Sequence, residues 1–277
     1  MIHKTLLACT GAALLACSSA NAGWSEQIDL NQYSHGTIIN GVDLGSVIID
    51  GDNFHNSLDH VVIFDTNLRN TRDTDLQGPN GSSGSWARGN LSQSSETLGN
   101  ILILQEVDRN FAGYTDGSQT AVKKPDDEGR RSGGTNPGAG EITFNFNSQV
   151  NSFGFTLIDV EETGEFNSET GFFAMFSDGN KTTKVSFADL IDSNSIYYDP
   201  SIKFGNNSAN RIEALTAAEL GLERIQYATI NLGGSGGVGQ LNVTGVPSPT
   251  AAIAGVAIMG VLLGRRGKRN NHAAVEA

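Results

Sequence analysis

Residues 141–147, with the sequence Glu-Ile-Thr-Phe-Asn-Phe-Asn, decide the fold class, because apolar and polar side chains alternate along them without a break. A two-residue period predicts a β-strand that presents its isoleucine and both phenylalanines on one face. The same spacing returns at 153–157 and at 172–176. Shorter apolar runs bounded by turn residues predict further strands at 46–50, 60–65, 100–106, 182–188, 195–199, 201–205, 223–232 and 238–244.

Helical signals are scarce between the two chain ends. The best lies at Thr216–Leu220, where Thr216 and Glu219 form a capping-box pattern and Gly221 supplies a stop. Glycine is abundant, at 34 residues, and proline is rare, at 6, which suits short strands joined by tight turns. We therefore expect one all-β domain over residues 23–245, an antiparallel β-sandwich with a jelly roll as one form of it.

The charge of this expected domain is strongly negative. Between residues 23 and 249 there are 13 basic and 29 acidic side chains, a net charge of −16. A field of that sign repels the phosphate backbone of nucleic acids and attracts divalent cations. The composition therefore argues against a nucleic-acid partner.

Residues 1–22 have the pattern of an export signal. A basic start and an apolar run precede Ala20 and Ala22, which form the A-x-A site that signal peptidase cuts after passage through the export translocon. An alternative is a lipobox that would leave Cys17 as a lipidated first residue. Cleavage after Ala22 is the favoured reading, and both alternatives predict an exported protein.

The segment 246–277 has the pattern of a membrane tail. As a helix, the apolar run at 250–264 would span about 22 Å, and a basic stretch at 265–269 follows it directly. Basic residues favour the cytoplasmic side and can snorkel to complete a short span. The positions that define the pattern are Pro247, Ser248 and Pro249 before the apolar run and Arg265 and Arg266 after it.

A proline motif, a short apolar helix and an arginine-rich end behind an N-terminal signal resemble the PEP-CTERM sorting tail of Gram-negative bacteria. The resemblance implies processing by an exosortase-like membrane enzyme and delivery to the cell surface or beyond, among extracellular polysaccharide. The usual motif is Pro-Glu-Pro, whereas this chain has Pro247-Ser248-Pro249. The tail is therefore expected either to be removed or to remain as an anchor in the inner membrane.

Acidic side chains gather in loops and at strand ends in three parts of the expected domain. Carboxylate and amide oxygens are the ligands that calcium prefers, and calcium takes six to eight of them. The alternative is that these side chains form the solvated surface of an acidic extracellular protein. The candidate calcium ligands are Asp65, Asn67, Asp73, Asp75, Asp126, Asp127 and Asp159.

The domain also resembles a recurrent exported β-domain, of no assigned activity, that is found with such tails. The resemblance concerns architecture rather than function. The segments that carry it are Phe64-Asp65, Asp73-Thr74-Asp75-Leu76, Pro125-Asp126-Asp127, Leu157-Ile158-Asp159 and the turn Gly234-Ser235-Gly236.

Signals of catalysis or of sugar binding are weaker. The five histidines show no metal-ligand spacing. Glu106 with Asp108 could supply the carboxyl pair of a glycosidase, as could the pair at 161–162. Trp86 and Tyr114 lie in long loops where an exposed ring could stack on a sugar. The alternative for Trp86 is that it folds back over the edge of the sheet.

We therefore expect an exported, non-enzymatic surface or matrix protein that is stabilised by calcium and associated with extracellular polysaccharide. A glycan-binding module centred on Trp86 is the second hypothesis, and a carbohydrate-active hydrolase is the third. Calcium is the only cofactor expected.

Overall fold

The computed structural model describes residues 23–54, 59–78, 86–92, 96–106, 122–127, 138–161 and 173–245. The export signal, Cys17, Tyr114, Asp108 and the whole 246–277 tail lie outside these ranges, and their predictions remain predictions. Within them, no helix has both the length and the apolar character that a bilayer span requires.

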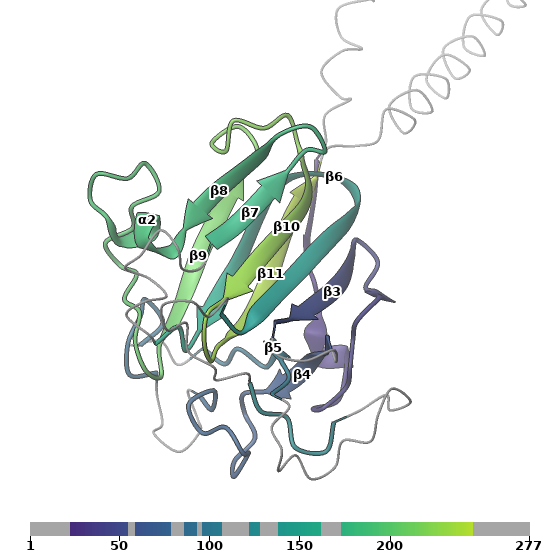
Figure 1. Cartoon of the computed structure of the whole chain (residues 1–277), viewed down its shortest axis with the longest axis vertical. Helices are drawn as coiled ribbons and strands as arrows, with labels where there is room; N and C mark the ends of the chain where they lie inside the picture. The colour runs from purple at the N-terminus through teal and green to yellow at the C-terminus, as the bar shows by residue number, and fades with distance from the viewer. Residues whose placement is uncertain are drawn as a thin grey trace, which may run out of the picture. The chain divides into compact units, whose positions relative to one another are not determined.

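The described chain is antiparallel β-sheet with very little helix, which confirms the predicted all-β class (Figure 1). The short helices are η1 (Leu30–Gln32) and α2 (Phe187–Ile191). The strands are β1 (Trp24–Gln27), β2 (Val42–Asp43), β3 (Val47–Asn53), β4 (Val61–Asp65), β5 (Asn100–Leu104), β6 (Gly140–Ile158), β7 (Phe173–Ser177), β8 (Thr182–Ser186), β9 (Ala209–Thr216), β10 (Ile225–Leu232) and β11 (Gly237–Gly245).

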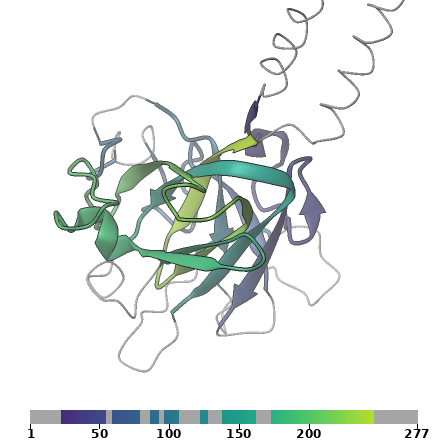
Figure 2. The same cartoon turned by 90° about the horizontal axis from the view of Figure 1, so that it is seen from above.

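Strand β6 organises the sheet, whose main path runs β4-β5-β11-β6-β10-β7-β8. The first half of β6 pairs with β3 on one side and β10 on the other, so that Phe144 lies opposite both Ile49 and Ala228. The second half pairs with β9. An exposed stretch at 147–149 separates the halves, and Figure 2 shows the long teal strand curving. The strands predicted at 141–147 and 153–157 are therefore one continuous strand.

Phenylalanine side chains spaced two residues apart form the centre of the core. The ring of Phe153 lies 5.2 Å from that of Phe144, 5.3 Å from that of Phe155 and 6.4 Å from that of Phe176. All four rings are buried. Truncating one buried phenylalanine typically costs about 3–5 kcal/mol, so the alternating pattern that predicts β6 also accounts for much of its stability.

The strands predicted at 195–199 and 201–205 are wrong, because polar side chains fold this segment into successive turns. The Asp192 carboxylate accepts a hydrogen bond from the Asn194 amide at 2.9 Å, and the Asp199 carboxylate accepts one from the Ser201 amide at 2.8 Å. Side chains that bond the backbone two residues ahead compete with strand pairing. Strand β9, whose apolar spacing is irregular, was not predicted.

The short helical turn predicted at Thr216–Leu220 forms as a single turn after β9, with its capping box. The Glu219 carboxylate accepts from the Thr216 amide at 2.9 Å, and the Leu220 amide donates to the Thr216 carbonyl at 3.1 Å. The α-helix α2, where Ser186 and Asp189 form the equivalent box, was not predicted. Because residues 182–188 alternate like a strand, the sequence pattern concealed the start of this helix.

Candidate divalent-cation site

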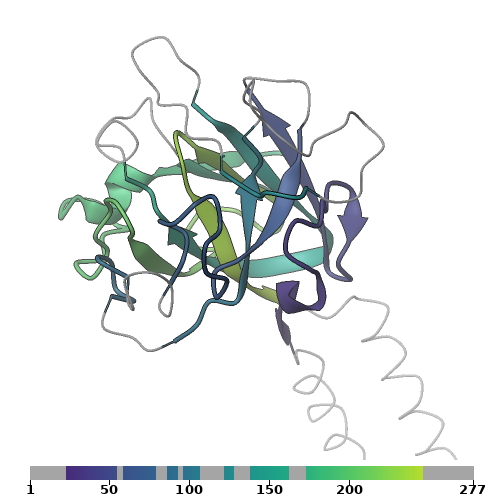
Figure 3. The same ribbon diagram turned by 90° about the horizontal axis from the view of Figure 1, so that it is seen from below.

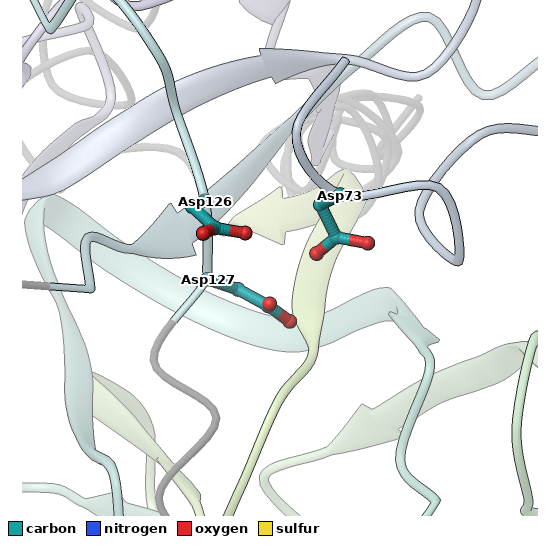
Figure 4. A group of neighbouring side chains, drawn as sticks. All are labelled: Asp73, Asp126 and Asp127. Carbon is teal, nitrogen blue, oxygen red and sulfur yellow. The ribbon is translucent and has the colours of Figure 1, made fainter. Parts of the chain in front are cut away.

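Three carboxylates converge beside the end of β5. One oxygen from each of Asp73, Asp126 and Asp127 lies within 4.8 Å of the others. Figure 4 shows Asp126 and Asp127 on one segment and Asp73 on a facing loop, with the carboxylates of Asp73 and Asp127 turned toward the same space. The segment of the pair is held against β5, because the Glu106 amide donates to the Asp126 carbonyl at 2.9 Å. We call these three residues the acidic cluster.

Asp73 is positioned by a turn of its own loop. Its Oδ1 accepts hydrogen bonds from the amides of Asp75, at 2.9 Å, and Leu76, at 3.2 Å. Leu76 is fully buried in the apolar group that contains Phe64 and Trp86. The burial of Leu76 anchors the loop three residues after Asp73, and this holds the Asp73 carboxylate in the cluster.

Asp127 is the most enclosed member of the cluster, with 7% of its surface exposed. Its Oδ2 accepts a hydrogen bond from the Gly236 amide. Burial raises the pKa of Asp127 well above its usual range, and the negative charges of Asp73 and Asp159 raise it further. Gly236 has φ of +149°, and a Cβ there would lie 3.0 Å from the Ile158 carbonyl oxygen, so the site requires glycine.

Asp159 follows β6 and extends the negative charge around the cluster. Burial raises its pKa to about 7, and the charges of Glu161 and Asp73 act in the same direction, against the hydrogen bond that the Asn207 amide donates to Oδ1. The backbone of Asp159 has φ of +55°. Left-handed geometry at a non-glycine residue is uncommon and is concentrated at functional sites.

Arg72 supplies positive charge on one side of the cluster. Its Nε bonds to Asp126 Oδ2, and a terminal guanidinium nitrogen lies 3.5 Å from Glu106 Oε2. Burial raises the pKa of Asp126 to about 7, and hydrogen bonding with Glu106 adds to the rise, while Arg72 opposes it. One arginine therefore faces a group of carboxylates that share a small, partly buried space.

Carboxylates packed this closely need a compensating positive charge. Burying an ionised carboxylate without a partner is costly, so the group either takes up protons or holds a cation. The raised pKa values of Asp126, Asp127 and Asp159 correspond to the first outcome, the uptake of protons. An all-oxygen donor set suits the second outcome and matches the preference of calcium.

Of the seven candidate calcium ligands, the structure brings five to one region and separates two. Asp73, Asp126 and Asp127 form the acidic cluster, and Asp159 and Asp75 lie beside it, since their charges act on the same groups. Asp65 and Asn67 instead form a local turn, in which Asp65 Oδ1 accepts from the Asn67 amide at 2.9 Å. The Asp65 amide donates to His35 Nδ1 at 3.0 Å.

The sequence analysis missed one group at the cluster and gave another a different role. Arg72, which bonds to Asp126, was not singled out, and Glu106 was considered only as one of the carboxyl pair of a glycosidase. Four of the five segments that carry the resemblance to the exported β-domain meet here, through Asp73, Asp127, Asp159 and Gly236.

Trp86 does not present its ring to solvent. It is 1% exposed and packs in the apolar group with Leu76 and Leu91. A Cβ on Gly78 would lie 2.8 Å from the indole, so backbone covers it closely. The exposed alternative for Trp86 is therefore wrong, and burial under the loops is correct. Among the described aromatic residues, Tyr198 is 42% exposed and lines a pocket of about 400 Å³ together with Ile196.

No family model, curated protein or solved structure matches the chain. The fold and the site together define it as an antiparallel all-β protein with a partly buried acidic cluster formed by loops from distant parts of the sequence.

Proposed function

We propose that this chain is an exported, non-enzymatic protein of the cell surface or extracellular matrix, stabilised by a bound calcium ion and associated with extracellular polysaccharide. The acidic cluster is the observation that carries the proposal. Asp73, Asp126 and Asp127 place carboxylate oxygens within 4.8 Å of one another, and Asp159 adds a further buried carboxylate nearby.

The chemistry of the donors favours calcium over other divalent metals. Each member of the group offers oxygen, whereas zinc and copper sites usually include imidazole or thiolate ligands. Calcium also tolerates irregular coordination, while magnesium requires a near-ideal octahedron. Carboxylates that come from separate loops, as Asp73 and Asp127 do, suit the irregular case.

Export is consistent with a site of modest affinity. Extracellular calcium modules work with dissociation constants of roughly 0.1–1 mM, so a site assembled from loops is sufficient outside the cell. The signal pattern of residues 1–22 and the sorting pattern of residues 246–277 support the same destination. A processed or anchored tail then delivers residues 23–245 to the surface.

We also propose that residues 23–245 form a β-sandwich. Support comes from β6, whose two halves pair with different strands. Support also comes from the phenylalanine rings that its inward positions contribute to a common core. In this arrangement the loops of the acidic cluster lie at one end of the layers, where a calcium ion would tie them together.

The decisive experiment is calorimetry of residues 23–245 with excess calcium and with chelator at pH 7.5. Calcium at about 100 times its dissociation constant contributes about 2.7 kcal/mol, which raises the melting temperature by about 5–10 °C for a domain of this size. Asp73→Asn should abolish the shift. Asp65→Asn, the same change in a separate turn, should retain it. An identical melting temperature with and without calcium would falsify the metal site.

A further inference from the structure

A pocket of about 560 Å³ lies next to the acidic cluster and has the opposite charge. Its lining includes Arg69, Arg72, Lys123 and Lys124, together with His35 and Leu68. These four cations are almost half of the ten arginines and lysines in the described residues. In a domain with a net charge of −16, such a concentration of positive charge calls for a specific partner. We call this hollow the basic pocket.

Three of its four cations are available to a ligand. Arg72 pairs with Asp126 and Glu106. Arg69, Lys123 and Lys124 are exposed, and in the described part of the chain no carboxylate forms an ion pair with them. They come from two segments, 68–72 and 123–125, that both line the hollow, so an anion entering it would meet positive charge from each segment.

His35 adds a hydrogen-bond donor to the basic pocket. Its Nδ1 accepts from the Asp65 amide at 3.0 Å, which places the proton of the neutral ring on Nε2. Burial lowers the pKa of His35, although the charge of Asp65 opposes the change, so the ring stays neutral near pH 7. The edge contact of His35 with Phe64, at 5.1 Å between ring centroids, fixes its orientation.

We propose that the basic pocket binds a carboxylate-bearing sugar unit of an acidic polysaccharide. The proposal rests on the polysaccharide association in the proposed function and gives that association a site and a chemical class. Arginine presents a planar fork that matches a carboxylate. Asn70 offers an uncharged polar side chain to the hydroxyls of a sugar, and Leu68, 40% exposed, offers an apolar surface to its ring.

Size and charge separate this ligand from its competitors. A volume of about 560 Å³ is within the usual range for small organic ligands and is far larger than an inorganic anion needs. The pocket beside Tyr198 is lined by Asp199, Glu213 and Glu219, so it would repel an acidic sugar. Between these two pockets of the described residues, an acidic unit is therefore favoured in the basic pocket, and a neutral glycan would prefer the one beside Tyr198.

The test is titration calorimetry of residues 23–245 with tri-galacturonate, in chelator because uronates themselves bind calcium. We expect binding by the acid and none by its methyl ester, which lacks the negative charge. Lys124→Gln should weaken the affinity by about tenfold or more, as expected for one hydrogen bond between charged groups. Lys203→Gln, the same change on an exposed lysine outside the pocket, should alter it less than twofold.

Each other outcome overturns the assignment. Equal binding of the methyl ester would show that the carboxylate is not recognised. Equal losses of affinity in the two lysine variants would show that only the overall charge of the protein matters. If inorganic phosphate displaces tri-galacturonate at equal concentration, the pocket is a general anion site. The calcium shift in melting temperature is read separately in Lys124→Gln, so failure of the metal site and failure of the basic pocket give different results.

Discussion

The acidic cluster and the basic pocket are built from the same two segments of chain, yet they place their charges in opposite environments. Along one segment Arg72 lines the pocket and Asp73 joins the cluster, and along the other Lys124 precedes Asp126 and Asp127 in the same way (Figure 3 views these loops from below). The carboxylates are largely buried, whereas the free cations are exposed. Buried charge affects folding free energy and exposed charge affects binding.

The largest expected effect is that of Asp127→Asn, which should change the melting temperature in opposite directions with and without calcium. In chelator at pH 8, Asp127→Asn should raise the melting temperature by a few degrees, because it removes a carboxyl group whose ionisation is opposed by burial and by the charges of Asp73 and Asp159. The amide oxygen can still accept from Gly236. In calcium the same variant should be less stable than the parent, since a ligand is lost.

Thermal melts of the parent and of Asp127→Asn under both conditions measure this crossover. Asp65→Asn is the matched control, because its carboxylate sits in a local turn. Destabilisation of Asp127→Asn by the same amount with and without calcium would show that Asp127 only supports the fold.

The pH dependence should be nearly as large. The pKa of Asp126 and that of Asp159 rise from 3.8 to about 7 in the fold, so the native state binds more protons than the unfolded chain between these values. Their contribution to stability is present below about pH 4 and is lost as the pH rises through 7.

Urea midpoints between pH 4.5 and 8.5 test this prediction in chelator, because most of the loss falls between the unfolded and folded pKa values. His35 and His60 have pKa values lowered from 6.5, so their contribution rises with pH through the middle of this range and partly opposes the loss. The metal-free protein should lose stability as the pH rises, and excess calcium should flatten the profile. A profile that is flat in chelator would mean that the carboxylates are ionised at little cost.

The sequence predicts those parts of the molecule that depend on local pattern. Alternation identifies β6 and most of its partners, and the acidic segments contain the residues of the cluster. The pairs Asp65/Asn67 and Asp73/Asp75 look alike in sequence, and both form turns that accept from their own backbone. Only the packing of Leu76 beside Phe64 brings the second pair to Asp127, and no local pattern contains that information.

The basic pocket illustrates the same limit. Arg69 and Lys124 are 55 positions apart, and each is surrounded by acidic residues in the sequence. Net charge therefore predicts repulsion of every anion, while the fold gathers the cations at one place. The burial of Trp86 has no local sequence signal either, because it depends on the packing of Leu91 and Gly78 against the indole ring.

A smaller effect is expected where the two sites meet, at Arg72. Arg72→Gln removes the partner of Asp126, and in chelator at pH 8 it should lower the free energy of unfolding by about 1–2 kcal/mol, between the values for exposed and buried ion pairs. Calcium should restore most of the loss, because it neutralises the same carboxylate. Arg211→Gln breaks the more exposed pair with Glu96 at 2.6 Å and should cost less than about 1 kcal/mol. Equal losses in the two variants, unaffected by calcium, would separate Arg72 from the metal site.

The smallest effect, and the one that separates the two sites most cleanly, is that of salt. The Debye length falls to about 3 Å at 1 M ionic strength, so the exposed Arg69, Lys123 and Lys124 should lose most of their attraction for tri-galacturonate. The enclosed Asp127 is screened much less, and the calcium shift in melting temperature should change by no more than about 2 °C when measured in sodium chloride. If salt removes the calcium shift as readily as it removes sugar binding, then the acidic cluster is open to solvent, and the contrast between buried and exposed charge is lost.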